Sequence, residues 1–207
     1  MMGNRHQTHC TAFEGFRCIA SGELTQVALK TKEVIDRGGI APVLIFDDLT
    51  SEQVEVDFRG TSAEVLKRLE ETSQDSPDDA PAHSDEGAPR GPGRPKLGVV
   101  AREVTLLPRH WDWLNGQPGG ASVALRRLVD EARRLYEGRD RVRRSQESAY
   151  RFMSAMAGNF PGFEESTRAL FARDHGRFDE LVEPWPVAIR DHARKLAAVT
   201  FQGASGS

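Results

Sequence analysis

The sequence predicts an α+β fold, and three observations support this prediction. The first third mixes short apolar runs with a helical period, a polar proline-rich tract follows, and helical periods dominate the second half. The length allows one domain or two small ones. We expect a small ββαββα domain (residues 1–70), a disordered acidic linker (71–93), a strand-helix-helix segment (94–138), a helical bundle (139–201) and a flexible tail (202–207).

The first hairpin and helix are predicted close to the N-terminus. The run TAFEGFRCIA, from Thr11 to Ala20, contains two short apolar-aromatic strands around the turn pair Glu14-Gly15. Apolar residues then recur at a helical period from Leu24 to Asp36. Gly38-Gly39 supplies the left-handed cap with which such a helix ends.

A second hairpin and helix complete the predicted N-terminal domain. The continuous apolar run from Pro42 to Asp47 is short enough to be a buried strand. Apolar and polar residues alternate from Gln53 to Phe58, which predicts its partner strand. Thr61 and Glu64 have the spacing of a capping box, so a helix is expected to run through Leu69.

The tract from Glu70 to Pro92 separates this domain from the rest of the chain. It contains four prolines, several acidic residues and almost no apolar side chain. Such a segment cannot bury enough surface to offset the entropy of ordering it, so we predict a disordered linker.

A strand-helix-helix segment is predicted after the linker. A β-rich run extends from Val99 to Leu107, and Pro108 ends it. A short helix from Pro108 to Asn115, a tight turn containing Gly116 and Pro118, and a long amphipathic helix from about Ala121 follow.

The rest of the chain predicts a helical bundle. Apolar residues fall at every seventh position from Leu128 to Met156, but Gly138 weakens the helix, so one broken helix or two helices fit equally. The string GNFPG is a clear stop. Three short helices are then expected, with Asp174 as a candidate N-cap and Pro184 and Pro186 marking the start of the last one: Phe163 to Ala172, Asp174 to Val182 and Trp185 to Val199.

Charge is distributed unevenly along the chain. From Arg90 to Arg144 there are 13 basic and 6 acidic residues, whereas the remaining residues hold 15 basic and 25 acidic ones. A segment of net charge +7 within a chain that is otherwise −10 favours binding of a polyanion by that segment.

The order strand-proline-helix-turn-helix between Val99 and Leu135 resembles a ribbon-helix-helix DNA-binding domain. The resemblance implies an obligate homodimer in which Val99–Leu107 pairs with its copy and enters the major groove. Neither face of this strand is cleanly polar, which departs from the family pattern. An ordinary strand-helix-helix element that dimerises or packs on the first domain is the alternative. The nucleic-acid-binding residues implied by the resemblance and by the basic arm and helix are Arg94, Lys96, Arg102, Thr105, Arg109, Gly120, Ser122, Arg126 and Arg127.

The basic arm itself resembles part of an AT-hook. Gly93-Arg94-Pro95-Lys96 matches the end of that motif, which inserts into the narrow minor groove of A·T-rich DNA. Pro92 occupies the position of the first arginine of the hook, and the alternative reading is a basic linker end.

Enzyme and metal chemistry have little support in the sequence. His6, His9, Cys10 and Cys18 could ligate a metal, but their spacing matches no zinc pattern. The acidic residues around Asp47 and Asp48 are typical of a turn, and no phosphate-binding or nucleophile motif is present. We therefore expect a non-enzymatic protein without a cofactor. The absence of a signal-peptide pattern and of a long apolar run predicts a cytoplasmic protein without a membrane span.

Three strings stand out along the chain: RPKLGVVAREVTLLPRHWDWLNGQPGGASVALRRLVDEAR, APVLIFDD and FMSAMAGNFPGFEESTRALF. Through these strings nearly the whole chain resembles an uncharacterised bacterial family, domain of unknown function 2239, which implies no activity. The function we predict is DNA binding by a homodimer, as in a transcriptional regulator. The alternative is a protein–protein interaction or adaptor module, and the C-terminal helices are a candidate surface for a protein partner.

Overall fold

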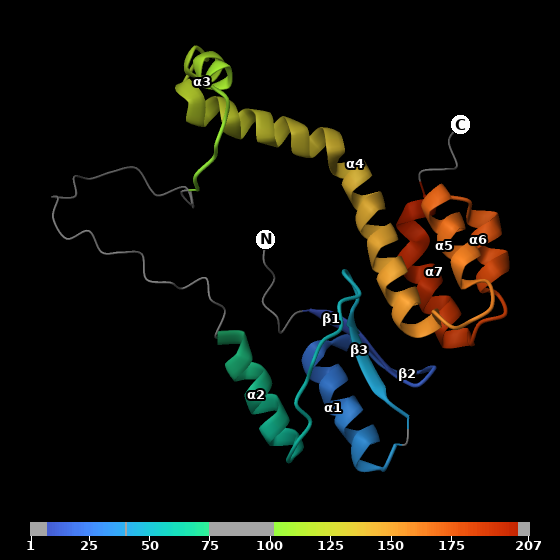
Figure 1. Ribbon diagram of the computed structural model, residues 1–207. Helices are drawn as coiled ribbons and strands as arrows, with labels where there is room; N and C mark the ends of the chain where they lie inside the picture. Colours follow the sequence, from blue (N-terminus) through green and yellow to red (C-terminus); the bar gives the residue numbers. More distant parts are fainter. Residues whose placement is uncertain (1–7, 40, 75–101, 203–207) are drawn as a thin grey trace. The chain divides into compact units, whose positions relative to one another are not determined.

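The computed structural model describes residues 8–39, 41–74 and 102–202. It confirms the α+β fold class, with a three-stranded sheet near the N-terminus and seven helices in the described ranges (Figure 1). The chain divides into two compact units, one made of residues 1–76 and 138–207 and the other of residues 77–137. The two units are described separately below.

The sheet of the first unit is built on the predicted N-terminal hairpin. Strands β1 (His9–Glu14) and β2 (Arg17–Glu23) are antiparallel, and the turn between them contains Gly15, whose φ of 53° favours glycine. Strand β3 (Val43–Asp47) pairs antiparallel with the other edge of β1, which gives the order β2-β1-β3. The predicted first hairpin is therefore confirmed.

Helices α1 (Leu24–Asp36) and α2 (Ser62–Gln74) follow the local signals in the sequence. Gly38 has a φ of 80°, as expected of the residue that ends α1. The capping box forms at the start of α2, because the Thr61 N–H donates to the Glu64 carboxylate at 2.7 Å and the Glu64 N–H donates to Thr61 Oγ1 at 3.4 Å. Helix α2 continues to Gln74, beyond Leu69 and into the predicted linker.

The strand predicted at Gln53–Phe58 is wrong. Only a single bridge from Gln53 to Phe46 forms, and the Val54 N–H donates to the Ile45 carbonyl at 2.8 Å. The chain then leaves the sheet, and Arg68 on α2 donates to the carbonyl oxygens of Asp57 and Arg59. The observed order is consequently ββαβα.

The helices of the second half match the sequence pattern closely. Helix α4 (Gly120–Ala157) is one continuous helix through Gly138, since one interior glycine costs only about 1 kcal/mol. Asp174 caps α6 by accepting a hydrogen bond from the Arg177 N–H at 3.0 Å, as predicted. The other helices are α5 (Phe163–Ala172), α6 (His175–Val182) and α7 (Val187–Phe201). No helix in the described ranges has the length and apolar character needed to cross a membrane.

The sheet and the helical bundle of the first unit share one hydrophobic core. The ring of Phe152 on α4 lies 5.4 Å from that of Phe13 on β1 and 5.3 Å from that of Phe46 on β3. A smaller core lies on the opposite face of the sheet. It is formed by Cys10, Ala12 and Ile45, which alternate with the residues of the first core along the same strands, and by the apolar face of α1. Residues 1–70 and 139–201, which we predicted as separate domains, thus contribute to one compact unit.

The second unit is described from residue 102 onward. Helix α3 (Pro108–Asn115), as predicted, is joined to the start of α4 by a glycine-rich turn. Residues 102–107 carry no strand hydrogen bonds within the described chain. The other parts of the predicted linker, the AT-hook-like residues 93–96, the first residues of the predicted ribbon (99–101) and the tail 203–207 lie outside the described residues.

Candidate nucleic-acid interface

The predicted binding residues that the structure describes all belong to the second unit. Arg102 and Thr105 are exposed on the extended segment, and Arg109 is exposed on α3. Ser122, Arg126 and Arg127 are exposed on the first turns of α4, while Gly120 is half-buried at its start. Arg94 and Lys96 lie outside the described residues. The structure therefore places these six side chains and Gly120 on one extended segment and two helices.

An apolar stripe on the second unit is largely uncovered. Leu114 and Ala124 are its buried hydrophobic residues within the described ranges, at 3% and 2% exposure. Further along α4, Leu128 and Leu135 are exposed, Leu135 by 73%, although their seven-residue spacing places them on the same side of the helix. The extended segment adds exposed Val104 and Leu107. Apolar side chains left in water in this number are typical of an interaction surface.

Arginines lie along a different edge of α4. Arg126 and Arg133 are seven residues apart and therefore share one side of the helix, away from the apolar stripe. The Nε of Arg126 donates to the Ser122 carbonyl at 3.2 Å, and Arg127 lies 3.9 Å from Glu131. Neither Arg133 nor Arg134 has an ion-pair partner among the described residues. These guanidinium groups are available to phosphate oxygens.

The described part of this unit carries a smaller net charge than the +7 counted over the segment from Arg90 to Arg144. Residues 102–137 contain six arginines and five acidic residues, a net charge of +1. Most of the predicted excess belongs to residues 90–96 and to the stretch of α4 beyond residue 138. Among the described residues, the candidate interface is therefore a local arrangement of arginines with little net charge.

The start of α4 offers backbone donors. Gly119 and Gly120 have φ values of 85° and 76°, and a Cβ on Gly119 would lie 3.1 Å from the Val123 side chain. The first N–H groups of an α-helix have no acceptor within the helix. An anion near Ser122 would therefore meet both these N–H groups and the positive end of the helix dipole.

Three buried or half-buried titratable groups with shifted pKa values lie in the first unit. Burial alone would raise the pKa of Asp48, but hydrogen bonds from Lys195 at 2.9 Å and Thr11 at 2.6 Å lower it below its ordinary value. Burial lowers the pKa of His192 to about 4, with its ring against Phe152 and with Nε2 unpartnered. Burial also raises the pKa of the Cys10 thiol to about 12, which makes it unreactive.

Sequence reasoning did not predict that His192 packs in the core or that Asp48 accepts hydrogen bonds from Thr11 and Lys195. It treated Asp48 as a turn residue like Asp47, and Asp47 does accept from the N–H groups of Leu49 and Thr50, both at 2.8 Å. The signal for His192 was present, because Ile189, Ala193 and Leu196 place it on the apolar face of α7.

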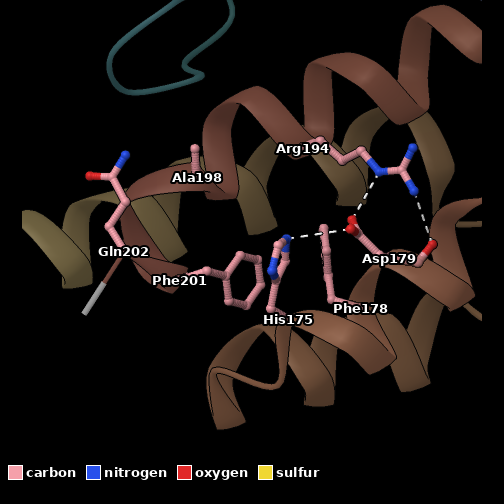
Figure 2. A pocket seen from close by; sticks show the side chains of 7 residues that line it. All are labelled: His175, Phe178, Asp179, Arg194, Ala198, Phe201 and Gln202. Atoms are coloured by element: carbon pink, nitrogen blue, oxygen red, sulfur yellow. Dashed lines mark hydrogen bonds and ion pairs between the residues drawn. The ribbon is translucent and has the colours of Figure 1, made fainter. Parts of the chain in front are cut away.

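One open groove lies between α6 and α7 (Figure 2). Its volume is about 380 Å³. In its wall the imidazole ring of His175 stacks on the phenyl ring of Phe201, with the two ring centroids 4.7 Å apart. The charged groups of the wall are paired with one another: Arg194 Nε lies 2.9 Å from Asp179, and His175 Nε2 lies 3.4 Å from the same carboxylate. The described residues contain no group of three His, Cys, Asp or Glu side chains that could hold a metal ion.

Comparison with known proteins assigns a family but no activity. The sequence profile of an uncharacterised protein family conserved in bacteria, DUF2239, matches residues 9–197. No curated protein and no solved structure matches the chain.

Proposed function

The chain belongs to the bacterial family DUF2239, and we propose that it is a homodimeric, non-enzymatic DNA-binding protein that acts as a transcriptional regulator. The proposal is based on the presence of two different exposed surfaces on the second unit. An uncovered apolar stripe suits a second copy of the chain, and an edge of arginines suits the phosphates of DNA.

The dimer is supported by the state of the extended segment. Residues 102–107 have no strand partner within the described chain, and their backbone N–H and C=O groups need one if they are to be buried. Antiparallel pairing of Val99–Leu107 about a two-fold axis would supply those hydrogen bonds. It would also bring Val104 or Leu107 out of water, at roughly 1.5–3 kcal/mol for each fully buried side chain.

The DNA contacts follow from the remaining exposed groups. Arg126, Arg127 and the N-terminal amides of α4 would hold phosphates and so fix the register of the protein. Arg102 and Thr105 would lie on the paired ribbon, and Arg109 on α3 beside it. In this arrangement the phosphate contacts supply most of the affinity for DNA. Any preference for a base sequence comes from contacts between the ribbon and the base edges.

The test is binding of the full-length protein to duplex DNA across a salt series. The variant Arg126→Ala/Arg133→Ala should bind more weakly, with the slope of log K against log salt reduced by about 0.9 for each lost phosphate contact. The matched control is Arg168→Ala/Arg177→Ala, which removes two exposed arginines that are paired with acidic residues on α5 and α6. The control should bind as the wild type does. Absence of binding at low salt to both random and A·T-rich duplexes would refute the proposal.

A protein-interaction module is the second candidate. It is favoured by the small net charge of residues 102–137 and by the proximity of Arg127 to Glu131, since paired arginines suit a protein surface as well as a phosphate. Capture of protein partners that survive nuclease treatment, together with no DNA binding, would support this alternative.

A further inference from the structure

We propose that the exposed side of α3, formed by Arg109 and Trp113, together with Gln117 in the turn after the helix, is a binding strip for an unpaired nucleobase and its phosphate. The proposal rests on the proposed nucleic-acid function and adds a ligand class to it. Single-stranded or locally unpaired DNA would be held there by stacking on the indole, a charge contact to the guanidinium and a hydrogen bond to the carboxamide.

The spacing of these residues places them together. Arg109 and Trp113 are four residues apart, which puts them on neighbouring turns of one side of α3. Gln117 lies in the turn that follows the helix. Leu114 on the adjoining side is buried at 3% exposure, and Trp111, three residues before it, is the less exposed indole at 36%. Trp113 is 52% exposed, so α3 has an inner side and an outer one.

The groups on the outer side are free to bind. Trp113 has no ring contact, and its indole forms no hydrogen bond within the described chain. Arg109 likewise has no ion pair there. Gln117 Nε2 donates to the backbone carbonyl of Trp113 at 3.3 Å, which anchors the carboxamide to the last turn of α3 and leaves its oxygen as an acceptor.

The chemistry favours an unpaired base over a base pair. In a duplex both faces of a base are covered by its neighbours and only the edges are accessible, so a flat indole can stack only on an unpaired or terminal base. An arginine beside the aromatic ring adds the phosphate contact that follows each base along a strand.

The experiment titrates the full-length protein with a single-stranded thymidine oligomer of about 12 nucleotides and with a duplex of similar length. Binding is followed by anisotropy and by quenching of tryptophan emission. Trp113→Ala should weaken single-strand binding about tenfold or more, whereas Trp113→Phe, which keeps a ring, should weaken it less. Arg109→Gln should reduce the single-strand salt slope by about 0.7. Asp112→Asn, which removes the carboxylate next to Trp113 in sequence, should strengthen binding.

The outcomes separate this inference from the proposed function. Single-strand binding that is unchanged in Trp113→Ala would overturn the inference, and unaltered duplex binding would then leave the proposed function standing. Trp113-dependent binding of the single strand without duplex binding would support the inference and refute the duplex proposal. Loss of the dimer in Trp113→Ala, measured by sedimentation, would show that the indole belongs to a protein interface and would also overturn the inference.

Discussion

Replacing His192 with leucine should remove the loss of stability that occurs when the pH falls from 6.5 to about 4. The imidazole is 7% exposed, lies against Phe13 and Phe152, and leaves Nε2 without a hydrogen-bond partner. Burial, with a smaller contribution from Lys195, lowers its pKa from 6.5 to about 4, although Asp48 opposes this shift. Protonation therefore requires a charge to be placed in the shared core.

The sign and size of the effect follow from linkage. Between pH 6.5 and about 4 the unfolded chain binds a proton at His192 that the folded chain does not, so stability falls as the pH falls through this window. Stability from this group is fully present above pH 6.5. A shift of this size corresponds to a loss of about 3 kcal/mol over the window, or about 1.4 kcal/mol per pH unit in its middle.

The assay is urea unfolding of the full-length protein at several pH values across that window. His192→Leu should unfold with a nearly flat pH dependence there and should differ from the wild type by less than about 1.5 kcal/mol near pH 7, since a buried apolar side chain of similar volume replaces it. His175→Leu, a substitution of a largely exposed histidine, is the matched control and should keep the wild-type slope. An equal slope in His192→Leu and the wild type would refute the reasoning.

Three further predictions concern the dimer and the shared core. The full-length protein should sediment as a dimer and Val104→Pro as a monomer, because proline removes an N–H from the pairing segment; an intact dimer would exclude this interface. Phe152→Ala should lower the free energy of unfolding by about 3–5 kcal/mol, whereas Phe171→Ala, on a side chain that is half-exposed, should cost much less; equal costs would contradict the shared core. Ser148→Ala should cost about 1–3 kcal/mol in thermal unfolding, because it leaves the buried hydroxyl of Ser51, now 2.8 Å from Ser148 Oγ, without a partner; an unchanged midpoint would argue against this bond.

Local signals predicted most of the secondary structure. The capping box at Thr61 and the cap at Asp174 act over three residues, so their sequence spacing is sufficient to place a helix start. The alternating residues from Gln53 to Phe58 misled the prediction, because alternation does not show which backbone groups pair. Near the end of this run, the carbonyl oxygens of Asp57 and Arg59 accept hydrogen bonds from Arg68 on the next helix and not from a neighbouring strand.

Long-range packing could not be predicted in the same way. Phe13 and Phe152 are adjacent in the core although well over a hundred residues separate them in sequence, and a single sequence carries no signal for such a pair. The polar tract after Leu69 suggested a domain boundary, yet both sides contribute to one core. Net charge has a similar limit, because a total of +7 over a segment does not show which arginines are free and which are paired.

The contrast between the two units is the reason for proposing the second unit as the binding unit. In the first unit the large aromatic and aliphatic residues of the shared core are buried, and the half-buried carboxylate of Asp48 is paired with Lys195. In the second, Leu114 and Ala124 are the buried hydrophobic residues among those described, while apolar and basic side chains remain in water. A unit of this kind gains its stability from what it binds, in proportion to the logarithm of ligand concentration over Kd. Unfolding of the second unit should therefore depend on protein and nucleic-acid concentration, whereas unfolding of the first unit should not.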